Sequence, residues 1–132
     1  MSNDKIIIDF SKIIRDITGE IIKDMLDPPL DRTIENAPDL TLGSVFAHAL
    51  TIGIRDVSIK EALKIFRMAQ KIESALQMNQ GKSEFSESDL NQLEEALAKI
   101  KHPLFTMPLY AGPMAEAIEE AKIELLAKRK SS

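Results

Sequence analysis

Residues 58–79, SIKEALKIFRMAQKIESALQMN, limit what the chain can fold into more than any other stretch. Ser58 and Glu61 form the S-x-x-E capping box, in which two side chains satisfy backbone N–H groups at a helix start. Apolar residues at helical spacing then predict one buried face: Ile59, Ala62, Leu63, Phe66, Ala69, Ile72 and Leu76. The segment Asn79-Gln80-Gly81 ends the pattern with residues that tolerate a left-handed cap.

Three further stretches predict helices, at about 41–53, 87–100 and 113–128. Thr41 and Ser86 suit the caps of the first two, and Pro113 suits the first turn of the last, where a missing N–H costs little. Four amphipathic helices predict a mainly α fold in which the helices pack on each other. With 132 residues the chain is long enough for one domain, 1–132, and too short for two ordinary ones.

The N-terminal segment predicts a small β element. Residues 5–10, KIIIDF, have the β-branched composition of a strand. Residues 12–26 fit either a helix or a β-hairpin that turns at Thr18-Gly19. The hairpin is favoured, because glycine supplies a positive φ at a turn and weakens a helix interior. An α+β arrangement is the alternative class.

Residues 26–40, LDPPLDRTIENAPDL, are rich in proline and acids, and they predict a loop. Pro28-Pro29 cannot continue a helix. We expect a plain linker, and a segment that contacts a partner is the alternative.

Composition and charge exclude several classes of function. There is no cysteine, so disulfides, thiolate metal sites and cysteine nucleophiles are excluded. The net charge is −4, which does not favour a nucleic-acid-binding domain. The sequence contains no recognisable signal peptide and no apolar run long enough to cross a bilayer, so we expect a cytoplasmic protein without a membrane partner.

The two histidines do not indicate catalysis. His48 falls at the border of the apolar face predicted for 41–53, with Ser44 one turn away, and we expect it to make a single structural hydrogen bond. His102 precedes Pro103, and there it is expected to stabilise the C-terminal end of the preceding helix. Phosphate-binding glycine motifs and E-x-x-H or H-E-x-x-H patterns are absent from the sequence. We therefore expect no enzyme, with no catalytic, cofactor-binding or metal-binding residue.

The connector 103–113, PLFTMPLYAGP, concentrates side chains of the kind enriched at interfaces. Its candidate partner-binding residues, with the first methionine after it, are Phe105, Met107, Leu109, Tyr110 and Met114. A buried lid over the core is the favoured interpretation. A surface facing a protein partner, or a second copy of the chain, is the alternative.

The residues 128–132 predict a basic, flexible tail. Lys128, Arg129 and Lys130 are the candidate nucleic-acid contacts, joined by Lys99, Lys101 and Lys122 if these share a face. A solubilising helix end is favoured over that role.

Several of these segments resemble a group of small bacteriophage and prophage proteins. The resemblance is carried by LTLGSVFAHAL, by KEALKIFRMAQKI and by SESDLNQLEEALAKIKHPLFTMPLYAGPMAEAIE, and it covers most of residues 5–120. It implies a viral protein in the bacterial host cytoplasm. The group lends no catalytic residue and no agreed biochemical function.

Together these observations predict a non-enzymatic, phage-encoded protein–protein interaction module. It would be a regulator or inhibitor of a host protein, or an assembly factor. One alternative is a nucleic-acid-binding accessory of phage replication or recombination, and another is a structural component of the virion.

Overall fold

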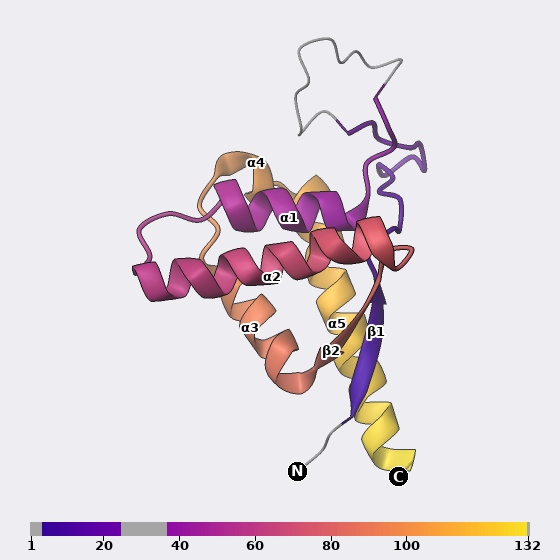
Figure 1. The fold of residues 1–132 in the computed structure, drawn as a ribbon. Coiled ribbons are helices and arrows are strands. Elements are labelled where there is room, and N and C mark those ends of the chain that lie inside the picture. Colours follow the sequence, from indigo (N-terminus) through magenta and orange to yellow (C-terminus); the bar gives the residue numbers. More distant parts are fainter. Residues whose placement is uncertain (1–3, 25–36, 132) are drawn as a thin grey trace.

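The computed structural model describes residues 4–24 and 37–131. In chain order, their elements are β1 (Lys5–Asp9), α1 (Leu42–Ile52), α2 (Ile59–Met78), β2 (Lys82–Ser86), α3 (Glu87–Ala98), α4 (Pro103–Thr106) and α5 (Pro108–Ser131) (Figure 1). The expected mainly α fold with a small β element is confirmed. The possible partner contact at 26–40 falls largely outside the described residues.

The small sheet joins two distant parts of the sequence. β1 pairs antiparallel with β2, and Ile6 lies opposite Phe85. Both side chains are fully buried, whereas Ile7 between the buried Ile6 and Ile8 is 56% exposed. This alternation is the pattern of a strand with one face on the core. The sequence predicted the strand at 5–10 but not its partner, because KSEFS is short and largely polar.

The segment between β1 and α1 turns at Thr18-Gly19, as the hairpin interpretation predicted. Arg15 and Ile21 form an antiparallel bridge, and Gly19 has a φ of 90°. The backbone N–H of Asp16 donates to the carbonyl of Glu20 at 2.9 Å. The helix alternative for this segment is wrong within its described part, residues 12–24.

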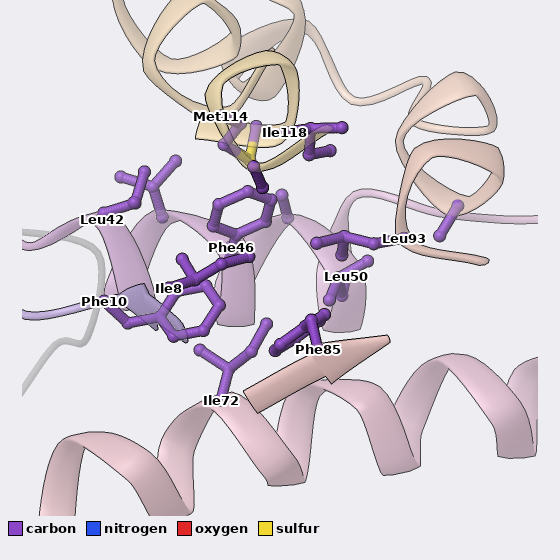
Figure 2. Close-up of a cluster of buried hydrophobic side chains, with 14 of the residues drawn as sticks. Ile8, Phe10, Leu42, Phe46, Leu50, Ile72, Phe85, Leu93, Met114 and Ile118 are labelled. Atoms are coloured by element: carbon purple, nitrogen blue, oxygen red, sulfur yellow. The ribbon is translucent and has the colours of Figure 1, made fainter. Parts of the chain in front are cut away.

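The helices form one core around α1. Phe46 is fully buried at its centre, with its ring edge-on to Phe10 at 5.7 Å. Figure 2 shows Phe46 between Met114 and Ile118 of α5 on one side and the side chains of β1 and α2 on the other. The core is therefore shared by the sheet and by helices from both halves of the chain.

The predicted buried face of α2 is wrong for the first half of the helix. Ile59, Leu63 and Phe66 are exposed, and the residues that face the core are Ile65, Ala69, Ile72 and Ala75. The helix carries two apolar stripes. Periodicity alone could not show which of them α1 covers.

The C-terminal helix is longer than predicted. It begins at Pro108, five residues before the expected start at Pro113, and it continues to Ser131. Pro108 supplies the same helix-start signal as Pro113, and the backbone N–H of Ala111 donates to the carbonyl of Met107 at 2.8 Å. The helix therefore extends into the segment for which the sequence predicted a flexible tail, since residues 128–131 are helical.

Candidate functional site

An apolar groove of about 670 Å³ lies between α3 and α5, and we call it the α3–α5 groove. Leu97, Ile100, Phe105, Met114 and Ile118 line it with apolar side chains. Ile123 and Leu126 also line it, and they remain 59% and 53% exposed. Its size lies within the range of small-molecule and peptide sites, which is about 300–1,000 Å³.

The connector between α3 and α5 closes one end of the groove. After α3 ends at Ala98, Ile100 bridges to Ile54, and Pro103 begins the short helix α4. The connection places Phe105 on the groove with only 1% of its surface exposed. The connector contains two prolines, each at a position that favours a helix start. The chain therefore turns there, and the apolar residues of the connector pack on the core.

His102 has a different role from the one predicted. Its Nδ1 accepts a hydrogen bond from the backbone N–H of Leu104 at 3.1 Å, so it caps the start of α4. The expected stabilisation of the C-terminal end of α3 is wrong, because the imidazole is placed at the start of the next helix.

Two ion pairs connect α3 to α5, and one of them lies in the lining of the groove. Lys122 donates to Glu94 at 2.7 Å, and both residues line the groove. Arg129 pairs with Glu87. The hydrogen bond from the Arg129 guanidinium, followed by its positive charge, holds the pKa of Glu87 below its usual range. The groove is thus an apolar hollow with a charged border.

The structure brings two of the five candidate partner-binding residues into this groove. Phe105 and Met114 line it and are buried. Met107, Leu109 and Tyr110 do not line the groove. Met107 is 47% exposed, and the Tyr110 ring packs edge-on against Phe105 at 6.2 Å.

The sequence reasoning missed Ile123 and Leu126. Both lie outside the face that α5 buries, which consists of Met114, Ile118, Ala121 and Leu125. Two large exposed apolar residues three positions apart on an amphipathic helix were the available signal.

The candidate nucleic-acid contacts are not gathered into one basic surface. Lys128 donates to the backbone carbonyl of Lys5 at 2.6 Å, and Arg129 pairs with Glu87. Lys122 pairs with Glu94, and Lys99 pairs with Glu61. These four cations connect elements of the fold to one another. Lys101 and Lys130 are exposed.

A polar cluster lies at the start of α1. The hydroxyl of Ser44 donates to Asp24 Oδ2 at 2.7 Å, and both residues are buried. His48 Nδ1 lies 2.8 Å from the Ser44 backbone carbonyl and 3.5 Å from its hydroxyl. Since a carbonyl only accepts, the short contact has His48 Nδ1–H as its donor. This is not the geometry of a catalytic triad, in which an unprotonated histidine nitrogen accepts the serine proton.

A second apolar surface lies on the outer side of α2. Ile59, Leu63 and Phe66 are 91%, 46% and 52% exposed, and they border a hollow of about 520 Å³ shared with the end of α1. We call the stripe formed by these three residues the α2 face. A stripe at positions i, i+4 and i+7 is the spacing of anchors that contact another helix.

Within residues 4–24 and 37–131, no three histidine or acidic side chains are placed so that they could hold a metal ion. None of the helices in the same residues combines the length and apolar character needed to cross a bilayer. Comparisons with protein-family models, with curated proteins and with solved structures each find no match to the chain.

Proposed function

We propose that the chain is a protein-binding module that takes an amphipathic helix of a partner protein into the α3–α5 groove. The observation that carries this proposal is the exposure of Ile123 and Leu126 beside an apolar hollow of about 670 Å³. Large apolar side chains gathered at a hollow gain free energy when a partner removes them from water.

The shape and chemistry of the groove support a helical ligand. Its two walls are themselves helices, and an amphipathic helix laid between two helices buries apolar residues at i, i+3, i+4 and i+7 spacing. Glu94, Glu119 and Lys122 line the groove together with the apolar side chains. An apolar centre with charged residues at the edge is the usual anatomy of a protein interface.

The setting expected from the sequence belongs to this proposal. We propose a phage-encoded regulator or inhibitor of a host protein, or an assembly factor for a viral one. The nucleic-acid alternative gains no support from the basic residues named for it, since Lys99, Lys122 and Arg129 pair with carboxylates. No specific observation favours the virion alternative.

The test is affinity capture from infected cells with two matched variants. Ile123→Asn with Leu126→Asn makes the groove polar, and Ile59→Asn with Leu63→Asn makes the same change on the α2 face. We expect the groove variant to lose a stoichiometric protein that the wild type and the α2-face variant both retain. Circular dichroism controls for retained helicity.

A photo-crosslinking amino acid at Ala115, an exposed residue that lines the groove, identifies what occupies it. We expect crosslinks to one helical segment of the captured protein. Capture of the same proteins by the groove variant, or crosslinks only to nucleic acid, would contradict the proposal.

A further inference from the structure

The α2 face has a basic row beside it. Lys60, Lys64 and Arg67 each follow one of the three apolar residues of the α2 face in the sequence, so each lies about 100° further round the helix. All three are exposed, and in the described part of the chain none of them forms an ion pair. This side of α2 is thus an apolar stripe with a row of exposed positive charges along one edge.

The outer side of α5 has the complementary pattern. Ala115 and Ile123 are exposed and lie on the groove side of the helix, with the exposed Glu119 between them at the same spacing, and each of the three is followed by an acid. The acids that follow the first and the last of them are Glu116 and Glu124. Glu120 completes an acidic row at four-residue spacing. Among the described residues, Glu120 and Glu124 form no ion pair, and Glu116 has only a loose contact with Lys12 at 3.8 Å.

The two surfaces cannot meet within one chain. α2 turns Ile65 and Ile72 toward the core, and α5 turns Ile118 and Leu125 toward it, so both surfaces point outward. A second copy of the chain brings the complementary pattern without any other partner. We propose that the chain associates with itself by docking the α2 face of one copy on the outer side of α5 of the next.

The order of the two rows sets the direction of the contact. On each helix, every residue of the charged row comes directly after a residue of the stripe in the sequence. The charged row is therefore displaced from the stripe in the same direction around both helices. When two such helices lie face to face, same-side rows meet only if the helices run antiparallel. The antiparallel arrangement places Lys60 and Lys64 against Glu120 and Glu124, as flanking charges do in antiparallel coiled coils.

This contact uses two different surfaces of each copy, so it is heterologous. Heterologous contacts form a ring if the rotation closes and an open chain of subunits if it does not. This inference does not rest on the proposed function, because the contact between two copies needs no other partner in the α3–α5 groove. Because Ile123 belongs to both the groove and the outer side of α5, we expect a helix bound in the groove to weaken self-association.

The test is a charge reversal on each side followed by a mixture. Sedimentation velocity of the wild type, from about 1 to 500 µM, is expected to show association that weakens with salt. Lys60→Glu with Lys64→Glu places acids against acids, and Glu120→Lys with Glu124→Lys places cations against cations. We expect each variant alone to associate at least about tenfold more weakly than the wild type.

An equimolar mixture of the two reversed variants restores two complementary interfaces. The acidic α2 of the first variant matches the basic α5 of the second, and the unchanged basic α2 of the second matches the unchanged acidic α5 of the first. We therefore expect the mixture to associate as the wild type does, with the two variants in 1:1 stoichiometry. Lys82→Glu with Lys101→Glu is the control for the α2 variant, because it gives the same change in net charge on exposed residues that belong neither to the basic row of α2 nor to the acidic row of α5.

Three results would overturn the proposal: a wild type that stays monomeric throughout, variants that associate as the wild type does, or a mixture that stays monomeric. Loss of partner capture by the groove variant is a separate readout. The proposed function can therefore fail while self-association stands, and the reverse.

Discussion

Gly43 lies where the start of α1 packs closely against its neighbours. A Cβ added there would lie 2.6 Å from Leu76 Cδ1 and 3.0 Å from the Cβ of Phe10. The backbone N–H of Gly43 also donates to the carbonyl of Phe10 at 2.8 Å. The glycine of the sequence LTLG thus allows α1 to pack directly on the end of β1 and on α2.

We expect Gly43→Ala to destabilise the fold. Overpacking costs about 1–3 kcal/mol, and the better helical preference of alanine offsets up to about 1 kcal/mol of it. Gly112→Ala is the matched control, because Gly112 lies in α5 with no atom within 4 Å of an added Cβ. It should stabilise the protein by about 0.5–1 kcal/mol. Urea unfolding measures both, and two changes of the same sign would contradict the close approach at Gly43.

At the scale of single residues, the sequence predicts helix caps well, because they depend on near neighbours in the chain. It predicts poorly the roles that depend on how distant elements are placed. Thr41, Ser58 and Ser86 cap their helices as expected, because capping depends on residues three positions apart. The role of His102 was predicted wrongly, because it depends on the start of α4, a four-residue helix that the sequence reasoning did not anticipate.

At the scale of elements, the residues that form the capping box of α3 also contact α2. Ser86 Oγ accepts from the Asp89 N–H at 3.2 Å, and Asp89 Oδ2 accepts from the Ser86 N–H at 3.0 Å. Lys71 of α2 lies 3.6 Å from the same carboxylate. Burial opposes ionisation of Asp89, but the Ser86 N–H and the Lys71 charge outweigh it and hold the pKa below its ordinary value of 3.8.

Because the pKa of Asp89 is lower in the folded chain, its ionised form stabilises the fold above the ordinary pKa of 3.8. That contribution is lost as the pH falls through the lower folded pKa. We expect Asp89→Asn to be less stable than the wild type near neutral pH and the difference to shrink below about pH 3.8. Urea unfolding across this range measures it.

Glu95→Gln removes the same charge from an exposed position later in α3 and is the control for net charge. A difference between the wild type and Asp89→Asn that stays constant with pH would show that the Asp89 charge does not contribute.

The helices that the sequence predicted correctly are those with a strong start and stop of their own. α1, α2 and α3 match their expected bounds within two residues at each end. α5 was predicted to start five residues late, because Gly112-Pro113 has the composition of a helix break. The orientation of α2 was wrong because both of its stripes are apolar, and only the position of α1 determines which is buried.

At the scale of the whole molecule, β1 connects the N-terminal segment to the middle of the chain and to α5, which packs on it. We expect Ile6→Ala to lower the stability of the helices as well as of the sheet, by about 2–5 kcal/mol, since Ile6 is fully buried. Ile7→Ala, at the exposed neighbouring position, should cost less than about 1 kcal/mol.

Circular dichroism at a helix wavelength measures this effect, because neither substitution lies in a helix. A helical transition that does not move in Ile6→Ala would show that the helices fold independently of β1. A single shifted transition would support one cooperative domain.

The candidate site also belongs to this scale, and little of it was predictable. Phe105 and Met114 were selected from the composition of their segment, and they do line the groove. The remaining wall comes from α3, and no local pattern indicates that α3 and α5 lie side by side. The α2 face could not be predicted for the same reason, because the sequence pattern places its residues on the buried face of the helix.

The pairing of β1 with β2 has a consequence for the synthesis of the protein on the ribosome. Ile6, Ile8 and Phe10 have their permanent cover only after the partner strand at 82–86 has left the exit tunnel. At roughly 5–20 residues per second, translation from Phe10 to Ser86 takes about 4–15 s. For that interval the nascent chain presents an apolar N-terminal segment without its native partner strand.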